Sequence, residues 1–120
     1  MDISAAIAKL KTEPGFTENV GMILVHNGVV RGWSRANREN VVAVDITHDE
    51  ERMNAICDEI QNRPGIFRVL AECRSGLLKP GDDVLFLVVA GDIRENVKPA
   101  LADLLDRIKS EAVAKREIMG

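Results

Sequence analysis

Three segments of the chain have apolar residues at the three-to-four-residue spacing of an amphipathic helix. The first covers residues 3–11 and ends before Pro14-Gly15, and the second covers residues 49–61, where Thr47 or Asp49 offers an N-cap. The third follows Asp92, which we expect to cap it, and is predicted to extend to about Glu117. The apolar positions of the three helices are Ile3, Ala6, Ile7 and Leu10, then Met53, Ile56, Cys57 and Ile60, then Val97, Leu101, Leu104, Leu105 and Ile108.

Four other segments are rich in β-branched and apolar residues and are predicted to be strands. They cover residues 20–31, 41–46, 66–73 and 84–90. Asn27-Gly28 in the first segment fits either a hairpin turn or a bulge. We favour one strand that bends there, because Val29-Val30 is too short to form a return arm. Residues 32–40 and 75–82 are expected to be connections.

The resulting order is helix, strand, strand, helix, strand, strand, helix, with short connections. This order favours an α+β fold with a mostly antiparallel sheet. The length of 120 residues fits a single domain over residues 1–120, and the hydrophobic fraction of 46% is enough for a core. A chain of this size buries only about two-thirds of its unfolded surface, so a homodimer would add useful burial.

Charge and composition exclude several classes of partner. Sixteen Lys and Arg residues against nineteen Asp and Glu residues argue against a generally basic nucleic-acid binder. No apolar run approaches the roughly 20 residues of a membrane span. The N-terminus carries Asp2 and does not resemble a signal peptide, and Cys57 and Cys73 have no CxxC spacing. We therefore expect a cytoplasmic protein that binds neither nucleic acid nor membrane.

Common catalytic and metal-binding motifs are missing. The sequence has no glycine-rich phosphate loop, nucleophile elbow or HExxH motif, and Ser75 has no evident partner base. His26 and His48 lack metal-ligand spacing, so we expect neither a metal site nor a cofactor. Cys73 could be a nucleophile, although a packed thiol is the more common case.

Basic residues at the ends of predicted elements are the remaining candidates. Arg31 and Arg74 follow strands, and Arg94 opens the last helix, where free backbone N–H groups favour an anion. Arginine binds phosphate or carboxylate through two hydrogen bonds, and lysine can also act as an acid, base or amine nucleophile. Each residue alone could be an ordinary surface charge. Further basic residues crowd the end of the last helix: Lys109, Lys115 and Arg116.

Three stretches resemble the large, catalytic subunit of molybdopterin synthase. They are GMILVHNGVVR at 21–31, RSGLLKPGDDVLFLVVAGDIR at 74–94 and IKSEAVAKRE at 108–117, and their order and spacing also match. The resemblance implies an α/β-hammerhead fold and a homodimer that binds a small ubiquitin-like sulfur-carrier subunit. It further implies transfer of sulfur from the carrier's thiocarboxylated C-terminus to a cyclic pyranopterin monophosphate, in molybdenum cofactor biosynthesis.

The resemblance also implies roles for individual residues. Arg31 would bind an anion, with Arg74 as a further substrate-binding residue, and Arg94 would hold the substrate phosphate. Lys109 would contact the substrate or the carrier's tail. Lys115 matches the lysine of the family's closing motif and would be an acid/base or a transient acyl acceptor, unless Arg116 takes that place.

The chain departs from the family pattern at several of these positions. Cys73 and Ile93 stand where the family usually has histidines, and Ala112-Val113-Ala114 replaces the Pro-x-Trp before the closing lysine. Two alternatives to catalysis therefore stay open. The chain could be a catalytically impaired relative that acts as a dimeric carrier- or anion-binding module, or an unrelated anion-binding domain.

Overall fold

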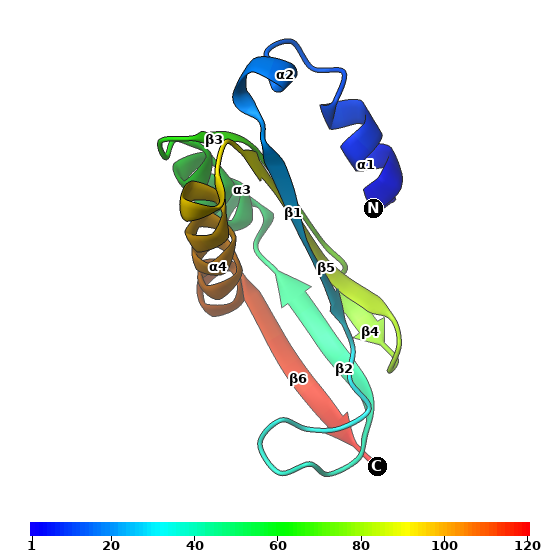
Figure 1. Cartoon of the computed structure of the whole chain (residues 1–120). Coiled ribbons are helices and arrows are strands. Elements are labelled where there is room, and N and C mark those ends of the chain that lie inside the picture. Colours follow the sequence, from blue (N-terminus) through cyan, green and yellow to red (C-terminus); the bar gives the residue numbers. More distant parts are fainter.

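The computed structural model describes residues 1–120 as a mixed assembly of helices and antiparallel strands (Figure 1). The predicted α+β class is confirmed, and the seven predicted elements keep their relative order, although three unpredicted elements lie among and after them. The elements follow along the chain as α1 (Ile3–Leu10), α2 (Phe16–Asn19), β1 (Met22–Val29), β2 (Val41–His48), α3 (Glu50–Gln61), β3 (Ile66–Cys73), β4 (Gly76–Leu78), β5 (Asp83–Gly91), α4 (Arg94–Glu111) and β6 (Val113–Met119).

The strands form two three-stranded sheets, in the orders β1-β5-β3 and β4-β2-β6, and every pairing is antiparallel. The central strand β5 is buried from Leu85 onward, which explains its uninterrupted apolar sequence. The register of β1 against β5 shifts between Gly28 and Val29. The predicted bend within one strand is therefore confirmed, and the hairpin alternative is excluded.

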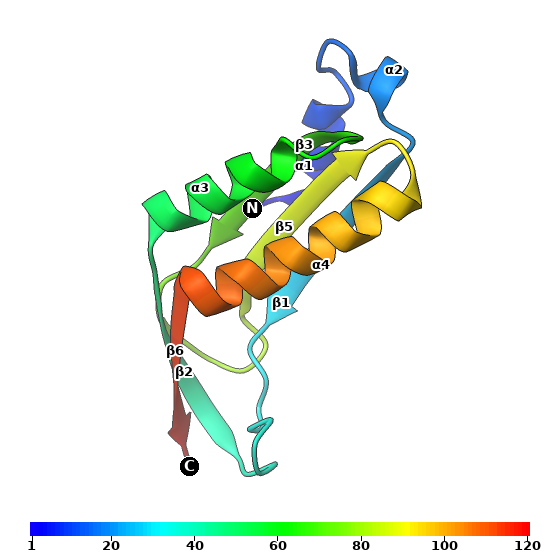
Figure 2. The same cartoon turned by 90° about the vertical axis from the view of Figure 1, so that its left-hand side faces the viewer.

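Helices α3 and α4 cover one face of the first sheet, and α1 lies on the opposite side (Figures 1 and 2). The side chain of Asp49 accepts a hydrogen bond from the Arg52 N–H at 3.0 Å and so caps α3, as one of the two expected caps. The core between the helices and the sheets includes the buried face of α4, formed by Val97, Ala100, Leu104 and Ile108. No helix combines the length and the apolar character needed to cross a membrane.

The end of the chain differs from the prediction. Helix α4 ends at Glu111, and the residues expected to prolong it form β6, which pairs with β2 along most of its length. Figure 2 shows α4 leading directly into β6 beside β2. The chain at 112–117 contains no helix breaker, so its local sequence permits a helix, and pairing with a distant strand decides otherwise. The expected helical extension to Glu117 is wrong.

Two smaller expectations also need correction. Residues 75–82 contain a short strand, β4, which pairs with residues 44–46 of β2 and is not only a connection. Asp92 does not occupy the N-cap position of α4, which belongs to Ile93. The carboxylate of Asp92 accepts hydrogen bonds from the Asn96 side chain at 2.9 Å and from the Ile93 N–H at 2.6 Å, and these bonds lower the pKa of Asp92.

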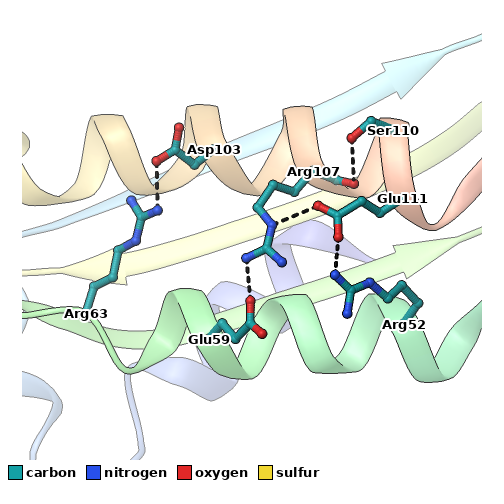
Figure 3. A network of polar contacts seen from close by, with 7 residues as sticks. All are labelled: Arg52, Glu59, Arg63, Asp103, Arg107, Ser110 and Glu111. Atoms are coloured by element: carbon teal, nitrogen blue, oxygen red, sulfur yellow. Dashed lines mark hydrogen bonds and ion pairs between the residues drawn. The ribbon is translucent and has the colours of Figure 1, made fainter.

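A network of ion pairs joins α3 to α4 along their polar edges (Figure 3). The guanidinium of Arg107 contacts Glu111 at 2.9 Å and also contacts Glu59, and Arg52 contacts Glu111 from α3. Hydrogen bonds, first from Arg107 and then from Arg52, lower the pKa of Glu111 to about 2. Pairs this exposed to solvent each stabilise a fold only modestly, so the network mainly fixes how the two helices align.

Candidate functional site

A cavity of about 500 Å³ lies where the end of β1, the start of β5, the end of α4 and the strand β6 come together. Its lining combines apolar residues of both sheets with four cationic side chains and one carboxylate. We call it the basic cavity. The cations are Arg31, Arg35, Lys109 and Lys115, and the carboxylate is Glu117.

Backbone hydrogen bonds fix the position from which Arg31 enters the basic cavity. The preceding residue, Val30, is buried; its N–H donates to the Asp82 carbonyl at 2.9 Å, and its carbonyl accepts from Gly81 at 2.9 Å. Gly81 has a φ of 94°, which suits glycine in this turn. The strand end is therefore tied to the turn before β5, and Arg31 projects from a fixed point.

The alternation of side chains along β6 decides which of its residues face the basic cavity. Val113, Lys115 and Glu117 line it, whereas Arg116 points the other way and contacts Asp45, its cross-strand partner on β2, at 3.6 Å. Adjacent side chains of a strand point to opposite faces of the sheet. Lys115 and Arg116 therefore cannot both enter the cavity.

Two of the groups in the basic cavity are held by neighbours in the loop 32–40. The hydroxyl of Ser34 donates a hydrogen bond to the Glu117 carboxylate at 3.0 Å. Two guanidinium groups lie over the ring of Trp33, that of Arg31 at 4.7 Å and that of Arg38 at 4.0 Å from its centroid. The aromatic face stabilises the cation above it, so Trp33 restrains Arg31.

His26 also lines the basic cavity, from β1. Its Nε2 atom is closed off from solvent and has no hydrogen-bond partner. Burial, and then the positive charge of Lys109, lower the pKa of His26. Both effects favour the neutral imidazole over the imidazolium.

Within a single copy of the chain, three of the six predicted site residues line the basic cavity: Arg31, Lys109 and Lys115. The other three lie elsewhere. Arg94 opens α4 fifteen positions before Lys109, which is about 22 Å along a helix. Its side chain is 80% exposed and contacts Glu95 at 3.3 Å. Arg74 is exposed after β3 and donates a weak 3.5 Å hydrogen bond to the Asp83 carbonyl.

The sequence interpretation missed His26, Arg35 and Glu117 as members of this site. Arg35 had a signal only as a charge in a polar loop, and Glu117 was expected in a helix. Glu117 would have been found by recognising the last segment as a strand, since it then shares a face with Lys115. His26 had no signal beyond being one of two histidines.

A second group of polar side chains lies outside the basic cavity. His48 contacts the Ser75 hydroxyl through Nδ1 and the Glu50 carboxylate through Nε2, the latter at 2.7 Å. Ser75, for which the sequence suggested no partner, thus lies in contact with an imidazole. None of the three residues lines the basic cavity, and together they join the end of β2 to the start of α3 and the segment before β4.

Both cysteines are poor nucleophiles in the folded chain. Burial raises the pKa of Cys73, and the nearby Glu50 carboxylate adds to the effect. Burial likewise raises the pKa of Cys57 to about 11, with smaller contributions from Asp58 and Glu50. The thiolate is the reactive form of cysteine, so these surroundings argue for packing rather than covalent chemistry.

The raised pKa of Cys57 predicts that its thiol is alkylated slowly in the folded chain. In the Cys73→Ser variant at pH 8, iodoacetamide should label Cys57 roughly a hundred times more slowly in the folded chain than in urea, because the thiolate fraction falls tenfold per pKa unit. Mass spectrometry of timed samples measures both rates. Equal rates in the two states, with the fold verified by circular dichroism, would show that the thiol environment has been misread.

Comparisons with known proteins give further evidence. A family model described as "MoaE protein" matches residues 1–111. A probable molybdopterin synthase of Haloferax volcanii is 36% identical over an alignment of 120 positions, gaps included, which covers 96% of this chain and 46% of that protein. The chain therefore spans about half the length of this curated relative.

Solved structures share the fold. Molybdopterin synthase from Staphylococcus aureus aligns with a TM-score of 0.72 and 24% identity over 84% of this chain and 76% of the other. Molybdopterin cofactor biosynthesis protein E from Burkholderia multivorans aligns with a TM-score of 0.74 and 22% identity, over 99% of this chain and 84% of the other. A chain of the complex of subunits 1 and 2 of the molybdopterin-converting factor from Helicobacter pylori aligns with a TM-score of 0.71 and 16% identity. The alignment covers 99% of this chain and 80% of the other.

Proposed function

The chain belongs to the MoaE family, and we therefore propose that it is the large, catalytic subunit of a molybdopterin synthase. In this role it transfers sulfur from a thiocarboxylated small carrier subunit to a cyclic pyranopterin monophosphate. The observation that carries the proposal is the basic cavity, with four cationic groups against one carboxylate. The substrate phosphate and the carrier's thiocarboxylate are both anions, and such a cavity suits them together.

The relatives support the partner as well as the reaction. The Haloferax volcanii protein carries the name of a probable molybdopterin synthase. The Helicobacter pylori structure is a complex of two different subunits of one converting factor. By analogy, the partner of this chain is a small carrier subunit whose C-terminal tail enters the basic cavity.

Within the basic cavity, each cation has a proposed role. Arg31, restrained by Trp33, binds an anionic group of the substrate or of the tail. Lys109 contacts the substrate or the carrier's tail. Lys115 is the acid/base or the transient acyl acceptor. In the second case its free amine attacks the thiocarboxylate carbon: a C–N bond forms, the C–S bond breaks, and the sulfur leaves as hydrosulfide with the amine's proton and becomes the nucleophile toward the pterin. Water then hydrolyses the acyl-lysine, which releases the carrier's carboxylate and restores the amine.

We propose further that the working unit is a homodimer, in which Arg94 of a second copy completes the basic cavity. Arg94 is far from Lys109 along α4 of the same chain, so a shared substrate requires the two residues to come from different copies. The guanidinium of Arg94 is exposed and its one ion-pair partner is the exposed Glu95, so a phosphate can reach it.

This assignment predicts the effect of Arg94→Ala. Binding of the pterin precursor should weaken by roughly 1.5–3 kcal/mol, the range for a hydrogen bond to a charged group, while the fold persists because the side chain is exposed. Isothermal titration with the precursor measures this change. Lys98→Ala, another exposed cation of α4, is the matched control and should bind normally. Unchanged affinity in Arg94→Ala would remove its assignment as the phosphate-binding residue.

Turnover is the experiment that tests the proposed activity. Purified chain, thiocarboxylated carrier and pterin precursor should together give a dithiolene product, detected by mass spectrometry, and carrier lacking the sulfur should give none. A chain that binds carrier selectively but forms no product, beside a competent control synthase, would instead be a dimeric carrier-binding or anion-binding module. The replacement of the family histidines by Cys73 and Ile93 is the observation that favours this alternative.

A further inference from the structure

His26 is the one described side chain with a buried polar atom that lacks a partner. Almost all buried polar groups in proteins are hydrogen-bonded, and an unpaired one destabilises the fold. An exception therefore needs an explanation. Because the ring lines the basic cavity, a bound molecule can supply the missing partner.

The local geometry of β1 makes room for this imidazole. Gly28 lies two positions along the strand, on the same face, and a Cβ atom at Gly28 would come within 3.0 Å of the His26 Nε2. Across the strand pair, His26 faces the apolar Leu87 of β5. Neither neighbour offers Nε2 a hydrogen bond. Nε2 is closed to solvent as the ring lies in the structure, so a molecule in the cavity reaches it only when the imidazole turns about its side-chain bonds toward the cavity that the residue lines.

The charges around His26 oppose its protonation while the cavity is empty of anions. Lys109 faces it from α4, Lys115 and Glu117 line the same cavity from β6, and Arg31 and Arg35 line it from beyond β1. Four cations and one carboxylate leave an excess of positive charge. An anion that enters reverses this balance and is also a hydrogen-bond acceptor.

We propose that His26 is a further anion-binding residue of the basic cavity, which takes up one proton from solvent when a phosphate or carboxylate group enters and then donates a hydrogen bond from Nε2. The neutral ring in the free protein and the imidazolium in the complex differ by that single proton. The inference deepens the proposed function and rests on it for the natural anion, but its test needs only simple ions. It gives the basic cavity a proton-exchanging group in a chain that has Cys73 and Ile93 at the positions of the family histidines.

Histidine titration by NMR tests the proposal directly, because the chain has only two histidines and His48 is the internal control. The pKa of each ring is measured with sodium sulfate, which stays a dianion across the titration, with sodium acetate, and with sodium chloride at the same ionic strength. Sulfate represents the substrate phosphate, and acetate represents the carrier's carboxylate. The His48→Gln variant assigns the signals.

The expected result is a rise in the His26 pKa of about one unit or more with sulfate or acetate over chloride, and little change for His48. The His26→Gln variant should bind sulfate several-fold more weakly than the wild type at pH 6, with a smaller difference at pH 8, as followed by the fluorescence of Trp33. A His26 pKa that is the same in all three salts would overturn the proposal, and so would unchanged sulfate affinity in His26→Gln. Proton uptake without turnover would refute only the proposed activity, and turnover without proton uptake would refute only the role of His26.

Discussion

Replacing Lys115 by alanine should lower the rate of sulfur transfer by about 10²–10⁴-fold, the usual loss when a positioned acid or base is removed. Lys115 enters the basic cavity from β6 beside Glu117, and its neighbour Arg116 points away and cannot replace it. The loss should therefore appear in the chemical step. Single-turnover measurements with preloaded carrier and precursor separate that step from binding.

Two controls make this result specific to Lys115. Arg116→Ala, at the adjacent position of the same strand, should keep most of the activity because its side chain is exposed and contacts Asp45. Sulfate binding by Lys115→Ala should weaken only modestly, since Arg31, Arg35 and Lys109 remain. Near-normal turnover in Lys115→Ala, or an equal loss in Arg116→Ala, would contradict the assigned role.

The second large effect is on stability. Leu104→Ala should lower the free energy of unfolding by about 2–5 kcal/mol, because the Leu104 side chain is fully buried and its removal leaves a cavity. Leu104 belongs to the core face of α4, which packs against α3 and β5. Small domains have a total stability of about 5–15 kcal/mol, so this loss is a large share of it.

Urea unfolding followed by circular dichroism measures this difference. Leu105→Ala provides the matched control, because it is the same substitution one position along the helix, at a residue that is only partly buried. Leu105→Ala should lower the free energy of unfolding clearly less than Leu104→Ala does. Equal costs at the two positions would mean that the buried face of α4 has been misassigned.

The sequence was sufficient for elements with a strong local pattern. The apolar spacing in residues 49–61, together with Asp49 as a cap, predicts α3 to within one residue, and the β-branched run at 66–73 predicts β3 with its observed bounds. In these segments the local preference and the packing agree.

The sequence failed where distant contacts decide. Residues 113–119 suit a helix locally and become a strand because β2 offers them a partner. That error hid the membership of Glu117 in the site and left the choice between Lys115 and Arg116 open. The lowered pKa of His26 likewise comes from burial and then from Lys109, which is distant in sequence and becomes its neighbour only through folding.

The most direct test of the central claim is a subunit-mixing experiment with Lys115→Ala and Arg94→Ala. Each variant alone should be nearly inactive at low precursor concentration. If one basic cavity uses Lys115 of one copy and Arg94 of the other, a randomly mixed dimer population contains about a quarter of its sites intact, and activity should recover to about that fraction. No recovery, with subunit exchange verified by native mass spectrometry, would contradict a shared cavity as the site of sulfur transfer.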